Sequence, residues 1–128
     1  MIKIGIIGVG YFGEKHLENI ISLKKLFNVI GFYDNNQKRS EEISKKYNVN
    51  SFNSIELLFE HCDAINITSS TNSHYNLIKL CLKKNKHIFI EKPISEKIEE
   101  IEEIQKITQG YKKIIQIGFI ERFNDALL

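Results

Sequence analysis

Apolar stretches with the length of β-strands alternate with helical patterns along the whole chain, and polar or glycine-rich segments follow the apolar stretches. The first apolar run, Ile2 to Ile7, leads directly into the sequence G-V-G-Y-F-G. Strands that alternate with helices are typical of right-handed crossovers and a doubly wound parallel sheet. Ligands of such a sheet bind outside the carboxyl ends of its strands, so we expect the segments after the strands to share one crevice.

The pattern predicts a Rossmann-type α/β fold, in three layers and one domain, over residues 1–128. After the first strand we expect further strands at 29–33, 49–52, 64–68, 87–90 and 113–118. A helix is expected after Gly13, and others over 36–47, from a cap at Asn53 or Ser54 through Phe59, and over 73–84 and 95–108. At 128 residues there is room for one hydrophobic core.

The glycine-rich turn after the first strand matches the pattern of a dinucleotide-binding loop. Gly8 allows a tight turn, Gly10 lets the backbone approach a pyrophosphate, and Gly13 allows the next helix to pack closely. Free N–H groups at the start of that helix, around Tyr11 and Phe12, would hold the phosphates. The bare pattern also occurs in ordinary turns, so its position after a strand and before a helix supports this interpretation.

Asp34 ends the second strand and is followed by Asn35, at a spacing where an acidic residue meets the adenosine ribose. A carboxylate there accepts bonds from both ribose hydroxyls and repels a 2′-phosphate, which favours NAD over NADP. Asp34 has an alternative role as a turn residue or helix N-cap. Lys38 and Arg39 leave NADP open, because they either reach back to a 2′-phosphate or form a solvated helix start.

Polar side chains also follow the strand at 64–68, at the start of a helix. They are Ser69, Ser70, Thr71, Asn72, Ser73 and His74. The hydroxyl and amide groups either line a dinucleotide or cap the helix. His74 either orients a ribose hydroxyl or packs in the interior.

The sequence Glu91-Lys92-Pro93 ends the strand at 87–90. Proline fixes its own φ and pushes the preceding residue into extended geometry, so Lys92 is held with its side chain over the strand ends. A lysine at this place can exchange a proton with a substrate hydroxyl beside a bound nicotinamide. The alternative is an ordinary exposed lysine.

Composition indicates a globular intracellular domain and excludes several classes of function. The chain is 42% hydrophobic and 27% charged, and its net charge of +2 is too small to suggest nucleic acid binding. No apolar run approaches the ~20 residues of a membrane span, and a signal peptide pattern is not found. We therefore expect a cytoplasmic location and no membrane partner. Cys62 and Cys81 lack metal-ligand spacing and are expected to be buried small residues.

Taken together, these segments resemble the nucleotide-binding half of the Gfo/Idh/MocA oxidoreductases, which include glucose-fructose oxidoreductase and inositol dehydrogenase. The resemblance rests on the glycine loop with its trailing His16, on Asp34, on the turn at 71–74, on Lys86-His87 leading to Glu91-Lys92-Pro93, and on the closing G-F-I-E-R-F-N. It implies NAD(P)-dependent oxidation or reduction of a sugar, nucleotide-sugar or cyclitol hydroxyl, with no metal. The closing segment, 118–124, is most similar to members that act as nucleotide-sugar 3-dehydrogenases.

The resemblance also implies roles for single residues and for the rest of the protein. Lys92 would be catalytic or orient the substrate, Glu91 would belong to the cofactor site, and Arg122 would lie near it. Two prolines usual in the family are Ser70 and Asp125 here. Family members continue into a second domain that binds the substrate and forms the homo-oligomer. We therefore expect residues 1–128 to lack activity alone, and the alternative is a free-standing NAD-binding regulatory or interaction module.

Overall fold

A parallel five-stranded sheet forms the centre of the computed structural model, which describes residues 1–119, 122 and 124–127. Its strands are β1 (Ile2–Ile7), β2 (Phe27–Tyr33), β3 (Ala64–Ile67), β4 (His87–Ile90) and β5 (Ile115–Ile117). The strand order is β2-β1-β3-β4-β5, and every neighbouring pair is parallel. The order reverses direction between β1 and β3, which is where a doubly wound sheet forms its binding crevice. The predicted Rossmann-type fold is confirmed.

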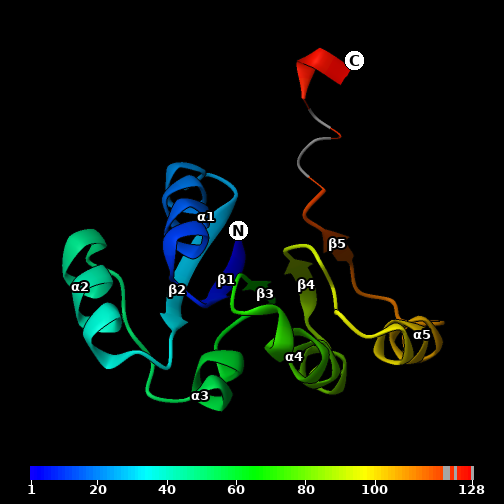
Figure 1. Ribbon diagram of the computed structural model, residues 1–128. Helices are drawn as coiled ribbons and strands as arrows, with labels where there is room; N and C mark the ends of the chain where they lie inside the picture. The colour runs from blue at the N-terminus through cyan, green and yellow to red at the C-terminus, as the bar shows by residue number, and fades with distance from the viewer. Residues whose placement is uncertain (120–121, 123, 128) are drawn as a thin grey trace.

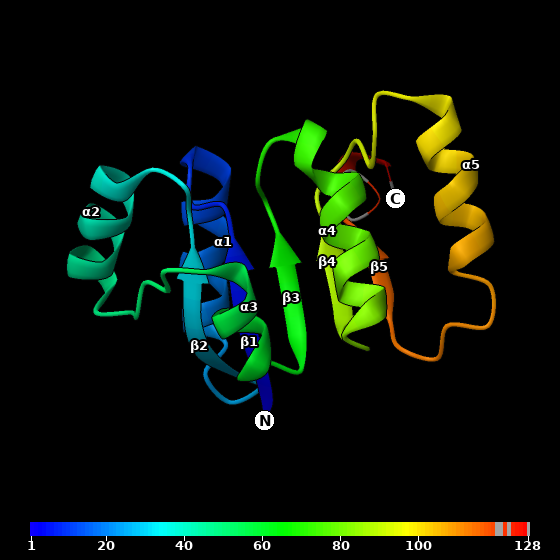
Figure 2. The same ribbon diagram turned by 90° about the horizontal axis from the view of Figure 1, so that it is seen from below.

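Helices cover both faces of this sheet (Figures 1 and 2). One face carries α1 (Tyr11–Ser22), and the other carries α3 (Ile55–Glu60), α4 (Thr71–Lys83) and α5 (Ile98–Ile107). The helix α2 (Gln37–Tyr47) lies beside the edge strand β2. A short 3₁₀ turn, η2 (Asp125–Leu127), follows β5.

Two clusters of buried side chains hold the helices to the sheet, because alternate residues of each strand point to opposite faces. On the α1 side, Ile4 and Ile6 pack with Leu17 and Phe32. On the other side, Ile7 and Ile65 contribute to a larger cluster that includes residues of α3 and α4. All four residues of β3 are buried, as expected for a central strand of a parallel sheet.

The predicted strand at 49–52 is wrong. The segment makes only one bridge to the sheet, at Ser51 beside Phe32. Its approach is close, since a Cβ on Gly31 would lie 2.5 Å from the Phe52 ring. A left-handed residue, Asn48, ends α2 at φ 53°, and Ser54 already caps α3 by accepting from the Leu57 amide. Its backbone hydrogen bonds to the sheet are both at Phe32, which donates to the Asn50 carbonyl and accepts from the Phe52 amide.

Other boundaries also differ from the sequence prediction, among them that of β2, which begins at Phe27 rather than at residue 29. The helix predicted over 95–108 begins only at Ile98, because Ser95 accepts a hydrogen bond from the Lys97 amide and donates one to Glu100, which forms a turn. The helix predicted from residue 73 begins at Thr71. The last strand is three residues long rather than six.

Candidate functional site

At two positions of the first turn, Gly8 and Gly13, a side chain would collide with neighbouring backbone atoms. Gly8 has φ of 89°, a conformation that side chains rarely adopt. A Cβ on Gly8 would lie 2.6 Å from the Ser69 amide nitrogen, and a Cβ on Gly13 would lie 1.9 Å from the Gly8 carbonyl oxygen. These glycines let α1 begin directly against the ends of β1 and β3.

Gly10 differs because the space beside it is open. A Cβ on Gly10 would meet none of the described atoms within 4 Å. Gly10 is the N-cap of α1, and no side chain accepts a hydrogen bond from the first turn of this helix there. Exposed amides at a helix N-terminus, with room for a close approach, are what a pyrophosphate needs.

Asp34 lies across from this turn, at the carboxyl end of β2. Its Oδ2 accepts from the Val9 amide at 2.9 Å and its Oδ1 from the Asn36 amide at 2.8 Å. The N-cap of α2 is Asn36, which accepts from the Arg39 amide, so Asp34 does not cap the helix. An ionised carboxylate has about four acceptor positions, so each oxygen can still accept a ribose hydroxyl.

A crevice of about 510 Å³ joins the ends of β1, β2 and β3. Six of the predicted residues line it: Gly8, Gly10, Asp34, Asn35, Ser69 and Ser70. Thr68, Ser73 and Asn76 line it as well. Thr68 donates its hydroxyl to the Gly8 carbonyl at 2.7 Å, which ties the end of β3 to the glycine turn.

Serine hydroxyls after β3 are bonded to each other and to the start of α4. The Ser69 and Ser73 hydroxyl oxygens are 2.7 Å apart, and Ser73 also donates to the Ser70 carbonyl at 2.6 Å. Ser70 donates to the Asn72 side chain at 2.7 Å. Thr71 and Asn72 lie in the first turn of α4 and are not among the residues that line the crevice.

His74 was placed in the cofactor site by the sequence, but its ring does not reach the crevice. The residue is 1% exposed, and its two ring nitrogens lie 2.8 Å from the Pro93 carbonyl oxygen and 3.1 Å from that of Ser69. Both nitrogens therefore face backbone oxygens rather than the crevice. The structure favours the packed alternative, in which His74 connects the segments after β3 and β4.

Glu91 points away from the crevice, toward α1. Its Oε1 lies 2.9 Å from Nε2 of His16, and its Oε2 accepts from the Lys92 amide at 3.2 Å. A Cβ on Gly118 would lie 2.8 Å from the Glu91 carboxylate, so this glycine makes room for it. In this structure Glu91 fixes the backbone before Lys92 rather than lining the crevice.

The remaining predicted residues are exposed. Tyr11 and Phe12 are 73% and 69% exposed and form an edge-on ring pair at the start of α1. Lys92 is exposed at the end of β4, where its bond to Pro93 is a cis peptide. Arg122 is exposed, and its amide donates to the Phe119 carbonyl. Ile120, Glu121 and Phe123 of the closing segment lie outside the described residues.

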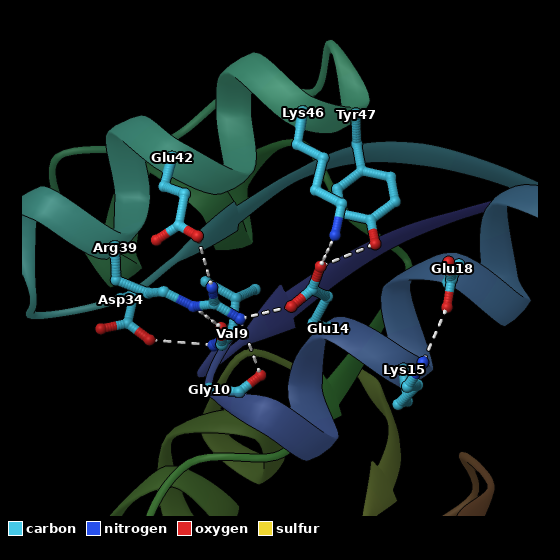
Figure 3. A network of polar contacts seen from close by, with 10 residues as sticks. All are labelled: Val9, Gly10, Glu14, Lys15, Glu18, Asp34, Arg39, Glu42, Lys46 and Tyr47. Carbon is cyan, nitrogen blue, oxygen red and sulfur yellow. Dashed lines mark hydrogen bonds and ion pairs between the residues drawn. The ribbon is translucent and has the colours of Figure 1, made fainter.

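Arg39 forms a network that neither sequence alternative anticipated (Figure 3). Its Nε donates to the Val9 carbonyl at 2.8 Å, and its Nη2 lies 2.6 Å from the Glu14 carboxylate. Glu14 also accepts from Lys46 at 2.6 Å and from Tyr47 at 2.8 Å. These bonds, that of Lys46 first, lower the pKa of Glu14 to about 2. Glu14 and Arg39 are 25 positions apart, so no local pattern reveals their contact.

A second unanticipated group lies between α1 and the strands. The Nδ1 of His16 is 3.3 Å from Oδ1 of Asn66, a buried side chain whose Nδ2 has no hydrogen-bond partner. Asn66 thus contacts the same ring that lies against Glu91.

The structure agrees with the expectation for the cysteines and offers no metal site in its described part. Cys62 and Cys81 are buried and free, and burial raises their pKa values to about 11 and about 12. No group of three His, Cys, Asp or Glu residues among the described ones could hold a metal ion. None of the helices in the described ranges is long and apolar enough to span a membrane.

The parallel sheet, the glycine turn at the start of α1 and the acidic residue after β2 define a dinucleotide-binding Rossmann domain. Residues 2–119 match the sequence model of the oxidoreductase family with an NAD-binding Rossmann fold, GFO_IDH_MocA. The chain belongs to this Gfo/Idh/MocA family. NAD is therefore its expected class of cofactor, as predicted.

Relatives in the family are dehydrogenases. The chain is 27% identical to UDP-N-acetylglucosamine 3-dehydrogenase of Acidithiobacillus ferrooxidans, over 98% of this chain and 39% of the relative. It is 33% identical to myo-inositol 2-dehydrogenase of Thermotoga maritima, over 96% of this chain and 37% of the relative. The chain thus spans about two fifths of the length of these relatives.

Solved structures agree with these sequence relationships. The UDP-N-acetylglucosamine 3-dehydrogenase of A. ferrooxidans superimposes with a TM-score of 0.89 at 26% identity, covering 98% of this chain and 41% of that one. The scyllo-inositol dehydrogenase of Lactobacillus casei, with bound NAD(H) and scyllo-inositol, gives a TM-score of 0.89 at 31% identity, covering 98% and 38%.

Proposed function

We propose that this chain is the cofactor-binding domain of an NAD-dependent dehydrogenase that acts on a hydroxyl of a sugar, nucleotide sugar or cyclitol. The observation that carries the proposal is that Gly10, Asp34 and Lys92 follow three strands of one parallel sheet. They therefore lie at the same edge, where such sheets bind ligands. The relatives named for UDP-N-acetylglucosamine and myo-inositol supply the substrate class.

The residues present fit a dinucleotide. The open space beside Gly10 is the cradle that a Cβ would fill, and the first amides of α1 would hold the phosphates. Asp34 retains acceptor positions for two ribose hydroxyls and would disfavour a 2′-phosphate by charge repulsion. The crevice side chains after β3, Ser69 and Ser70, offer further hydroxyls.

Lys92 would carry the proton in this reaction. A bound nicotinamide would supply the acceptor for the hydride that leaves the carbon bearing the hydroxyl. Nζ of Lys92 would exchange a proton with this hydroxyl, receiving it during oxidation and returning it during reduction. The Lys92 amide donates a hydrogen bond to the Glu91 carboxylate, and the Lys92 side chain is exposed at the carboxyl ends of the strands.

The proposal is tested by Lys92→Met in the native protein that carries this domain, with cyclitols and nucleotide sugars as substrates. We expect kcat to fall by about 10²–10⁴-fold, which is typical of a lost general acid or base, with little change in NADH affinity. Lys97→Met is the matched control, because Lys97 is an exposed lysine five positions further on. Loss of NADH binding in Lys92→Met, with turnover of the bound complex intact, would make Lys92 a cofactor anchor instead.

A further inference from the structure

Arg39 is a cation placed next to the edge where the ribose is expected. The peptide groups of Val9 connect it to Asp34: Asp34 accepts from the Val9 N–H at 2.9 Å, and the Arg39 Nε donates to the Val9 carbonyl at 2.8 Å (Figure 3). The carboxylate that would bind the ribose and the Arg39 guanidinium thus both contact Val9. Guanidinium groups bind phosphates strongly and in a bidentate manner.

Each of the three guanidinium nitrogens of Arg39, however, already has a partner. Its Nη2 contacts the Glu14 carboxylate at 2.6 Å and lies 3.5 Å from the Gly10 carbonyl oxygen. Its Nη1 lies 3.2 Å from the Glu42 carboxylate. The Arg39 side chain is only 23% exposed, and that of Glu14 is 16% exposed. A half-buried pair of this kind is screened less by solvent than a surface ion pair.

Glu14 is the partner that holds this arrangement in place. It lies in the first turn of α1, where Lys46 and Tyr47 of α2 also bond to its carboxylate. The Glu42 side chain is 62% exposed, so its contact with Arg39 is weaker. Movement of Arg39 away from the glycine turn would break its bonds to Val9 and Glu14 together.

We infer that Glu14 is a cofactor-selectivity residue: it holds Arg39 against the back of the glycine turn and so withholds this cation from a ribose 2′-phosphate. Discrimination against NADPH then has two parts, repulsion by Asp34 and sequestration of Arg39 by Glu14. The inference rests on the proposed function, because it concerns the same dinucleotide crevice.

The test compares NADH and NADPH affinities of purified variants by titration calorimetry. Glu14→Gln keeps the shape of the side chain but removes its charge, so Arg39 is released. We expect NADPH affinity relative to NADH to rise by about tenfold, the value of one charge-assisted hydrogen bond to phosphate. Glu14→Ala serves the same purpose if the glutamine variant does not fold.

Two further variants separate this effect from a general change in charge. Glu14→Gln combined with Arg39→Met should lose the gain in NADPH affinity, because the released cation is gone. Glu42→Gln removes an equal charge from the exposed partner of Arg39 and should leave the affinity ratio unchanged.

The inference is overturned if a folded Glu14 variant keeps the original affinity ratio, or if Glu42→Gln or the double variant shows the same gain. Failure of the unaltered chain to bind NADH would instead overturn the proposed function, and the inference with it. The two failures are therefore distinguishable in a single set of titrations.

Discussion

The imidazole of His16 on α1 lies 2.9 Å from the carboxylate of Glu91, which follows β4. The two side chains are 18% and 21% exposed, and they join segments 75 positions apart. The second carboxylate oxygen of Glu91 accepts from the Lys92 amide. The pair thus connects the helix of the glycine turn to the backbone of the proposed catalytic lysine.

We expect His16→Phe to lower the free energy of unfolding by about 1–3 kcal/mol, because it leaves the half-buried Glu91 carboxylate without its ring partner. Urea denaturation measures this change. His61→Phe is the control, since His61 is exposed. Equal stability of both variants and the unaltered chain would show that the His16 contact contributes nothing.

Two glycines of the first turn should respond differently to substitution. Gly10→Val should prevent NADH binding but cost less than about 1 kcal/mol of stability, because its side chain enters open space at a helix N-cap. Gly13→Ala should instead destabilise the fold by at least about 1–3 kcal/mol, since its Cβ would meet the Gly8 carbonyl. Calorimetric binding and thermal unfolding of both variants separate the two effects. Retained NADH affinity in Gly10→Val would contradict the placement of the pyrophosphate.

The lowered pKa of Glu14 predicts that the free energy of unfolding depends on pH in a specific way. This pKa is lowered in the folded state from 4.5 to about 2, first by Lys46 and then by Arg39 and Tyr47. A lowered folded-state pKa stabilises the fold above the unfolded value, so this contribution is complete above about pH 4.5 and is lost as the pH falls toward 2. The stability difference between the unaltered chain and Glu14→Gln should therefore shrink over this range.

Urea denaturation of both proteins between pH 7 and pH 2 measures this difference. Glu18→Gln is the control, because the Glu18 carboxylate is 51% exposed and forms only a surface pair with Lys15. A difference between Glu14→Gln and the unaltered chain that stays constant down to pH 2 would contradict the strong pairing of Glu14.

Much of the fold could be predicted because local patterns and the sheet agree. The apolar runs before Gly8, Asp34 and Glu91 are parallel strands of the sheet, and the residues after them lie at one edge of it. The segment at 49–52 has the composition of a strand, yet it bonds to the sheet only at Phe32. The length of a ladder depends on how the folded chain places a segment beside its neighbour, which β propensity does not record.

The candidate site was predicted less completely, because its side chains are positioned by contacts between distant segments. The sequence places His74 after β3, but only the folded chain shows that Pro93 and Ser69 occupy both ring nitrogens. Arg39 was expected in solvent or on a phosphate, and the structure places it on Val9 and Glu14. Side-chain direction at these positions depends on tertiary packing that a motif does not encode.

Titration calorimetry with NADH and NADPH shows whether the crevice binds NAD and whether Asp34 selects it over NADP. We predict tighter binding of NADH, and a smaller difference between the cofactors in Asp34→Ala because NADH is weakened selectively. Asp63→Ala is the matched control, because Asp63 also accepts a backbone N–H, that of Lys3, just before β3. Equal affinity of the unaltered chain for both cofactors, or no binding of NADH, would contradict the account.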